Sequence, residues 1–430
     1  MRLRLPRSVR PPLSRTLLTT ALLLALPAAL LLAFPRRAAT GLERLMPSAA
    51  LLQSFPAQAT ADPPLLWRQR LGPAGATRLW AAQRSLWWQF WGAHGDAGAY
   101  LVLSAPPSVP LPAHALRVDD LIVVAPDPLA RQLLDQELRI RRRAPRGLAA
   151  RCMQSLRQSQ AVHWNAGALA QILGPLAPLA QDLQQGCLVL GGERRALLWQ
   201  GEADASEGSM APPPPALPPA PLQPLASPQL LELRGRRLEL LLRGLLASPL
   251  LRQSLAQTYG LNAAPLALLQ RSSFQLRLRS VPSGAFQAAL ELQVQPPAAE
   301  GAAAQPLLNR WLNDLGRPLR DQGLEPSQPG GGITTWSRED GTVVGGWRWL
   351  ADRQLLLFLG PVPDRLPESS GLTADWRLRL RPDALASIGL LPPSVPPVVR
   401  RSQQLSMLGQ ARGQRSGERQ SAISGRLDLR

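Results

Sequence analysis

The sequence of 430 residues contains no lysine, three histidines and two cysteines, and its 29 acidic residues face 48 arginines. Without lysine, the chain has no phosphate-binding Walker lysine, no lysine for a Schiff base and no kinase-type ATP lysine. These absences exclude several large classes of enzyme. The use of arginine alone, beside much Ala, Leu, Pro and Gly, is typical of codon choice in a GC-rich genome.

The few histidines also restrict the chemistry. His94, His114 and His163 lie in different predicted elements, and none has a His, Cys or Glu at the spacing of metal ligands. We therefore expect no metal and no cofactor. Neither a G-x-S-x-G elbow nor a G-x-G-x-x-G phosphate loop is present. His94 and Asp96 form a polar pair in a glycine-bounded stretch, which is either a loop feature or a fragment of a catalytic pair.

The net charge of +19 is concentrated in three segments. Residues 1–37 carry seven arginines and no acid, residues 139–151 carry six more, and residues 400–430 have a net charge of five, so together they account for eighteen of the nineteen charges. A nucleic-acid binder usually carries its basic stripe on a folded surface with interleaved aromatics. This distribution instead favours solvated faces, and we expect no nucleic-acid partner.

A long apolar segment lies near the start. Residues 16–34, TLLTTALLLALPAALLLAF, are uncharged, and arginines are more numerous before them than after them. Nineteen helical residues span about 28 Å, enough for a bilayer core of about 30 Å. The charge bias predicts a cytoplasmic amino terminus, with the chain beyond about residue 38 in the periplasm or an equivalent lumen. The alternative is a cleaved signal peptide, but no small-x-small cleavage site follows.

Composition divides the chain into five parts. They are a leader with a single-pass anchor in the lipid bilayer (1–37), a spacer (38–66), a first α+β region (67–202), a proline-rich linker (203–229) and a second α+β region (230–430). The linker has nine prolines within residues 211–228, which favours an extended, semi-rigid chain.

Alternating apolar and polar residues predict antiparallel strands in both regions. The predicted strands and hairpins are 99–104, 187–200, 272–281, 288–295, 342–361 and 421–430, and the predicted helices are 166–185 and 305–323. The predicted fold class is α+β, with mostly antiparallel sheets and helices on one face.

Three strands are each followed by a polar residue and then by helical periodicity. Asp127, Asn165 and Asp383 occupy these corners in LIVVAPDPLARQLL, VHWNAGALAQIL and RLRPDALASIGLL. Their side-chain oxygens are suited to accept hydrogen bonds from the first free amides of a helix, so we interpret them as helix caps and not as catalytic acids.

The two cysteines bracket the helix predicted after Asn165. In an oxidising compartment Cys152 and Cys187 would form a disulfide. The alternative is that Cys187, which begins the strand CLVLGG, is a small buried hydrophobe.

Four tryptophans cluster in RLWAAQRSLWWQFW. On a helical wheel Trp80, Trp87 and Trp91 lie within about 40° of one another, and Trp88 is displaced by about 80°. This wide apolar face predicts core packing, because each buried Trp removes about 150–250 Å² from water. The alternative is an aromatic belt on the membrane, or a groove for a peptide or lipid.

The corner motifs, the WRWLADRQLLLFLG hairpin and the entry PSAALLQSFPA resemble an uncharacterised bacterial family common in cyanobacteria. The resemblance implies a membrane-anchored, exported protein with strand–Asp–helix units, and it implies no catalytic residues.

From these features we expect a non-catalytic binding, scaffolding or assembly factor at the membrane surface. The first alternative is an envelope hydrolase that uses His94 and Asp96. The second alternative is an arginine-rich nucleic-acid binder.

Overall fold

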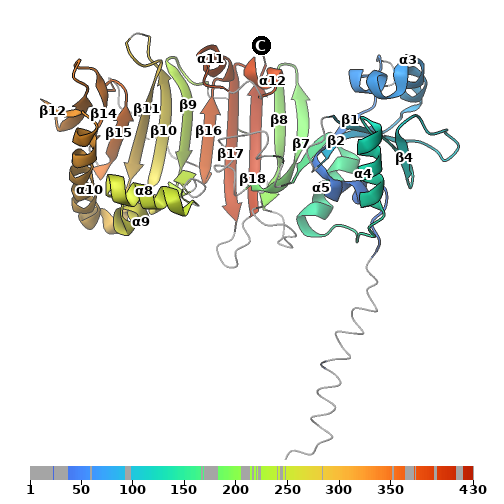
Figure 1. Ribbon diagram of the computed structural model, residues 1–430, viewed down its shortest axis with the longest axis horizontal. Coiled ribbons are helices and arrows are strands. Elements are labelled where there is room, and N and C mark those ends of the chain that lie inside the picture. Colours follow the sequence, from blue (N-terminus) through green and yellow to red (C-terminus); the bar gives the residue numbers. More distant parts are fainter. Residues whose placement is uncertain are drawn as a thin grey trace, which may run out of the picture.

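The computed structural model describes residues 37–58, 61–92, 98–165, 183–204, 224–239, 248–282, 284–350, 353–363, 374–391, 395–412 and 420–429, with a few single positions between them. These residues form nine α-helices and 18 strands, and all the strands belong to one antiparallel sheet. The fold is therefore α+β with a large antiparallel sheet, as the alternating segments predict (Figure 1).

Eight strands come from the amino-terminal half of the chain. They are β1 (Ala49–Pro56), β2 (Leu86–Gly92), β3 (Tyr100–Ser104), β4 (Ala115–Val118), β5 (Leu121–Val124), β6 (Ala161–Trp164), β7 (Gln185–Glu193) and β8 (Ala196–Asp204).

Ten strands follow in the carboxyl-terminal half. They are β9 (Gln229–Gly235), β10 (Ser273–Ser280), β11 (Ala288–Gln295), β12 (Glu325–Gly330), β13 (Ile333–Ser337), β14 (Val343–Trp349), β15 (Leu355–Leu359), β16 (Trp376–Leu380), β17 (Gln404–Arg412) and β18 (Gln420–Asp428).

The pairings give one continuous strand order. It is β4-β5-β3-β2-β1-β6-β7-β8 for the first half, followed by β18-β17-β16-β9-β10-β11-β15-β14-β13-β12 for the second. Strands β8 and β18 join the halves over nine consecutive residue pairs, from Ala196↔Asp428 to Asp204↔Gln420.

The two halves repeat one connectivity. In the first, β1 lies between β2 and β6; in the second, β9 lies between β10 and β16. The series β2-β3-β5 corresponds to β10-β11-β15, and β6-β7-β8 corresponds to β16-β17-β18. Because the last strand of each half pairs antiparallel with that of the other, the repeats are related by an approximate two-fold rotation between β8 and β18. The two ordered regions are thus one sheet.

Most helices lie at the two ends of the sheet, whereas α11 and α12 lie at its edge beside β16 and β17 (Figure 1). Those of the first half are α2 (Leu42–Leu45), α3 (Leu65–Ala82), α4 (Pro128–Leu138) and α5 (Gly147–Gln158). Those of the second half are α8 (Pro249–Tyr259), α9 (Ala263–Arg271), α10 (Gly301–Asp321), α11 (Pro382–Ser387) and α12 (Pro397–Arg400).

In the first half, helices cover both faces of the sheet, so the prediction of helices on one face is wrong there. Val102 and Val123 face a core with α4 and α5, whereas Leu101 and Ile122 face a core with α3. This two-sided burial explains why YLVL and LIVV are continuous apolar runs. In the second half, the apolar face packs on α9 and α10 through a core that includes Leu268 and Leu308.

Two predicted segments are integrated into the sheet. The predicted spacer contains β1, which pairs with both β2 and β6, so that part of the prediction is wrong. In the proline-rich segment, the described Leu217 and Ala220 are buried in a cluster with Leu408. The carbonyl of Leu217 accepts a hydrogen bond from Gln200 Nε2 at 2.9 Å, so this part of the predicted linker packs on the sheet.

The predicted membrane anchor, residues 16–34, lies outside the described residues apart from Leu23. Within the part of the chain that the structure describes, no helix combines the length and the apolar character needed to cross a bilayer.

Candidate functional site

The polar face of the second half-sheet carries a ladder of alternating charges. Arg379 of β16, Glu232 of β9, Arg277 of β10 and Glu291 of β11 lie directly opposite one another across four adjacent strands. Residues opposite each other in antiparallel pairs point to the same face, and opposite charges there attract. Leu231, on the same strand as Glu232, points to the other face because side chains alternate along a strand.

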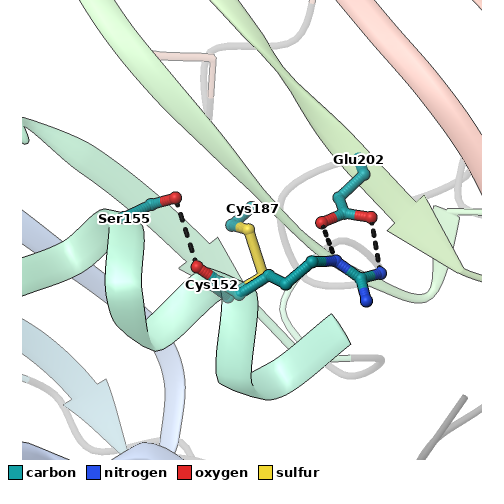
Figure 2. The surroundings of a disulfide bond; sticks show 5 residues. Cys152, Ser155, Cys187 and Glu202 are labelled. Atoms are coloured by element: carbon teal, nitrogen blue, oxygen red, sulfur yellow. Dashed lines mark hydrogen bonds and ion pairs between the residues drawn. A yellow bond between two sulfur atoms is a disulfide. The ribbon is translucent and has the colours of Figure 1, made fainter. Parts of the chain in front are cut away.

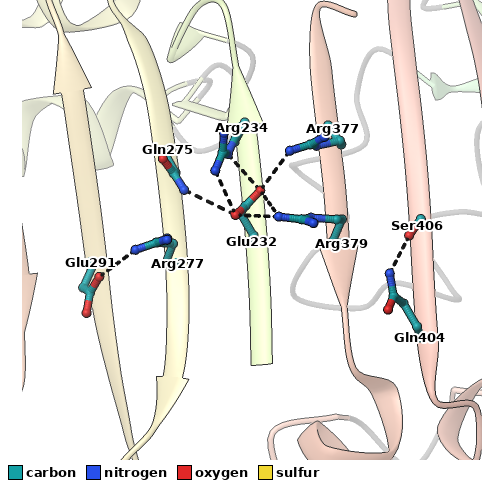
Figure 3. A network of polar contacts seen from close by, with 9 residues as sticks. All are labelled: Glu232, Arg234, Gln275, Arg277, Glu291, Arg377, Arg379, Gln404 and Ser406. Atoms are coloured by element: carbon teal, nitrogen blue, oxygen red, sulfur yellow. Dashed lines mark hydrogen bonds and ion pairs between the residues drawn. The ribbon is translucent and has the colours of Figure 1, made fainter. Parts of the chain in front are cut away.

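Glu232 is the centre of this ladder, and 1% of its surface is exposed. Its carboxylate accepts hydrogen bonds from Arg379 Nη2 at 2.9 Å and forms an ion pair with Arg234 Nε at 2.8 Å. Arg377 Nη2 lies 3.5 Å from the same carboxylate. Figure 3 shows the three guanidinium groups converging on Glu232 from β9 and β16.

The second carboxylate of the ladder, Glu291, is paired in the same way. Its oxygens lie 3.0 Å from Arg279 Nε and 3.8 Å from Arg277 Nη1. Strands β10 and β16 contribute four arginines to these pairs, and their side chains are only 12–19% exposed. They are Arg277, Arg279, Arg377 and Arg379. A buried charge is tolerated when it is paired and hydrogen-bonded, so the pairing within this network allows its charges to be buried in the fold.

The electrostatics of Glu232 oppose a role in proton transfer. Burial raises the pKa of this carboxyl, but the charges of Arg234 and Arg379 and their hydrogen bonds outweigh burial, so its pKa lies below its ordinary value. The pKa of Glu43 is also below its ordinary value. Burial raises this pKa, but a hydrogen bond from Arg37 and the charge of Arg157 lower it by more. Both groups are carboxylates at neutral pH.

A disulfide between Cys152 and Cys187 fixes α5 to the sheet, with 5.5 Å between their Cα atoms (Figure 2). Beside it, Arg151 of the same helix forms a bidentate ion pair with Glu202 of β8, at 2.6 and 2.7 Å. Cys187 and Glu202 lie opposite each other in β7 and β8, so the two links hold one helix to two neighbouring strands.

His163 lies opposite Cys187 in β6 and 3% of its surface is exposed. Burial lowers its pKa to about 4, and its Nδ1 atom has no hydrogen-bond partner among the described residues. It is a buried core residue that is neutral at neutral pH. His114 is exposed in the loop before β4.

His94 and Asp96, the predicted polar pair, lie outside the described residues. Among the residues that are described, no group of three His, Cys, Asp or Glu side chains is arranged to hold a metal ion.

The tryptophan cluster does not lie on one helix, so the helical-wheel prediction is wrong. Trp80 is in α3, which ends at Ala82, whereas Trp87, Trp88 and Trp91 are in β2. Gln83 has an extended backbone, with φ −72° and ψ 128°, and the aromatic run that follows favours a strand.

Three of these four tryptophan side chains are buried in the interior of the protein. Trp80 and Trp87 contact Trp67 edge-to-face, with ring centroids 4.9 and 5.7 Å apart. Trp88 points to the opposite face of β2 and donates its Nε1 hydrogen to the carbonyl of Leu156 at 2.8 Å. Trp80, Trp87 and Trp88 expose 5–7% of their surface, so these three form no lipid-facing belt, and Trp91 is half-buried.

The three predicted caps differ. Asp127 caps α4, since its carboxylate accepts from the amide of Ala130 at 2.9 Å. Asp383 lies inside α11 and Arg381 is at the cap position, so that prediction is wrong by two residues. Asn165 donates to the carbonyl of Ala49 at 2.6 Å, which ties the end of β6 to β1.

A surface cavity of about 500 Å³ lies where the first described residues meet the loop after α4. Its lining includes Arg44, Arg117 and Arg139, together with Asp119 and Asp135. A second cavity of about 710 Å³ lies at the ends of β17 and β18, lined in part by Arg381 and Arg426. In the second, Arg426 is paired with Asp428 at 2.6 Å.

Comparisons with protein-family models, with curated proteins and with solved structures found no match for the chain. The resemblance to the cyanobacterial-type family therefore stays a prediction.

Proposed function

We propose that the protein is a membrane-anchored extracytoplasmic factor that binds or scaffolds other envelope components and performs no catalysis. The anchor is the uncharged segment 16–34, and the bulk of the chain lies beyond the membrane. The disulfide between Cys152 and Cys187 supports export, because such bonds persist in oxidising compartments and are rare in the cytosol.

The observation that supports the non-catalytic part is the closed charge ladder, in which the carboxylate of Glu232 is 1% exposed and is paired with Arg234 and Arg379. Each described carboxyl with a displaced pKa, namely Glu43, Glu232 and Asp340, is more acidic than usual. His163 is displaced to about 4. General acid–base catalysis instead favours groups tuned toward the working pH. Within the ladder, Glu232 thus stabilises the pairing of β9 with β10 and β16, and we infer that the long sheet offers its surface for binding.

Fractionation of the full-length protein tests the anchor. We expect it in the membrane pellet after alkaline extraction, with its first forty residues intact by mass spectrometry. The matched variant Leu24→Arg/Leu30→Arg places two charges in the span, each costing about 2.5–3.5 kcal/mol at a helix centre, and should be released. Recovery of the intact wild-type chain in the soluble fraction would contradict the proposal.

The binding role is tested separately in mild detergent. We expect the intact chain to retain a protein partner in stoichiometric amount. Purification of the folded chain alone, under conditions that preserve other envelope complexes, would contradict a scaffolding role.

A further inference from the structure

The loop between α4 and α5, residues 139–146, carries five arginines and no acidic residue. Arg139, Arg141, Arg143 and Arg146 are exposed and Arg142 is half-buried. Arg139 forms an ion pair with Asp135 at 2.8 Å. Over the described ranges, Arg141, Arg143 and Arg146 make no ion pair, so their charges face solvent. This loop is called the basic loop below.

The basic loop is attached to the first described residues of the chain. Ala38 forms an antiparallel bridge with Arg143. The amide of Ala39 donates to the carbonyl of Arg142 at 3.1 Å, and the amide of Ala144 donates to the carbonyl of Arg37 at 2.9 Å. Figure 1 shows the start of the described chain running beside the loop that joins α4 and α5.

This attachment fixes the distance of the basic loop from the proposed anchor. Arg37 lies three positions after Phe34, the end of the apolar segment. Three residues extend at most about 11 Å. The headgroup layer is about 5–7 Å thick on each side of the bilayer core. The Debye length in physiological salt is about 8 Å. The arginines therefore lie within reach of charges on the membrane surface.

One apolar side chain stands among these arginines. Ile140 is 61% exposed, between Arg139 and Arg141. An exposed apolar residue flanked by cations is the arrangement that interfacial segments use, with the apolar group in the acyl boundary and the cations at the headgroups. The cavity of about 500 Å³ adjoins the same residues, and its lining holds Arg44 and Arg117 together with Asp119 and Asp135. Arg44 lies 3.7 Å from Asp119, so the unpaired positive charge of this region is that of the basic loop itself.

We propose that the basic loop is a membrane-facing surface that binds the phosphate groups of anionic phospholipids in the leaflet next to the exported domain. This inference rests on the proposed function, because only an anchored chain holds the loop against that leaflet. Binding at this second point would set the orientation of the sheet relative to the membrane, which attachment at a single point does not.

The test uses the full-length chain in lipid nanodiscs, which expose both leaflets to solvent. The discs contain either neutral phosphatidylcholine alone or phosphatidylcholine with about one third phosphatidylglycerol. A water-soluble arginine-selective dicarbonyl then modifies accessible side chains, and peptide mass spectrometry gives the rate at each position. We expect Arg141 and Arg143 to react at least about fivefold more slowly in the anionic discs, since each juxtamembrane arginine contributes about 1 kcal/mol, which is a fivefold factor.

Arg194 and Arg195, exposed between β7 and β8, are the internal control, and their rates should not depend on the lipid. The variant Arg141→Glu/Arg143→Glu/Arg146→Glu should lose retained phosphatidylglycerol from mixed micelles, whereas Arg194→Glu/Arg195→Glu should keep it. Equal labelling rates in both discs, for a chain inserted in both, would overturn the inference and leave the proposed anchor standing. A chain that enters neither disc would overturn the anchor and with it this surface.

Discussion

Trp199 of β8 lies directly opposite Gly425 of β18, and its indole ring fills the space that a side chain at position 425 would need. A Cβ atom at that position would overlap the ring. The pair lies in the middle of the nine-residue pairing that joins the two halves of the sheet. The union of the halves therefore depends on a glycine that no local turn requires.

The variant Gly425→Ala should lower the free energy of unfolding by about 1–3 kcal/mol, the usual cost of overpacking. Gly192→Ala is the control, because a Cβ at Gly192 meets nothing within 4 Å. Chemical denaturation measures both. A double-mutant cycle with Trp199→Leu should recover most of the loss, and the lack of any coupling would show that the ring does not occupy this space.

Glu232→Gln should destabilise the protein by about 3–5 kcal/mol, because it leaves buried arginines without their counter-charge. The control is Glu193→Gln, whose carboxylate is 52% exposed and pairs with Arg426. Exposed pairs contribute about 0–1 kcal/mol. Urea unfolding of the two variants compares them directly, and equal losses would contradict the central place of Glu232 in the ladder.

Removal of the disulfide by Cys152→Ala/Cys187→Ala should cost about 4 kcal/mol, from the loop-closure entropy of the 35-residue separation. A reducing agent should lower the melting temperature of the wild type and leave that of the double variant unchanged. If reduction affects neither protein, the two thiols are not joined in solution.

His163 should make stability fall in mild acid. Its pKa is about 4 in the folded protein against an ordinary 6.5, so the unfolded chain binds a proton that the folded chain does not. Stability is therefore full above pH 6.5 and declines by about 3 kcal/mol as the pH falls to about 4. His163→Leu should flatten this part of the pH profile of unfolding. An unchanged slope would assign the acid sensitivity to other groups.

Much of the fold follows from the sequence because alternation is a local property. The strands predicted at 272–281 and 288–295 are β10 and β11, and the hairpin predicted over 342–361 is β14 and β15. The corner at Asp127 also follows from local chemistry, since a capping carboxylate needs only its own helix.

Features that depend on register or on distant partners do not follow from the sequence. LELRG, LRLRS and WRLRL each alternate leucine with a charged or polar residue, yet only the pairing of β9, β10 and β16 shows that Glu232 meets three arginines. A helical wheel misplaces the tryptophans because LWWQFW fits both the helical and the strand period. The backbone is extended at Gln83, so the helix ends there and the aromatic run forms a strand. The neighbourhood of Arg37 and Arg143, 106 positions apart, leaves no local pattern.

The location of the carboxyl terminus is the most direct test of an anchored, exported protein. Two reporters are fused after Arg430 of the full-length chain, one active only outside the cytoplasm and one active only inside it. We expect activity from the first alone, abolished by the Leu24→Arg/Leu30→Arg variant of the span. Activity from the cytoplasmic reporter alone, with the wild-type leader intact, would contradict it.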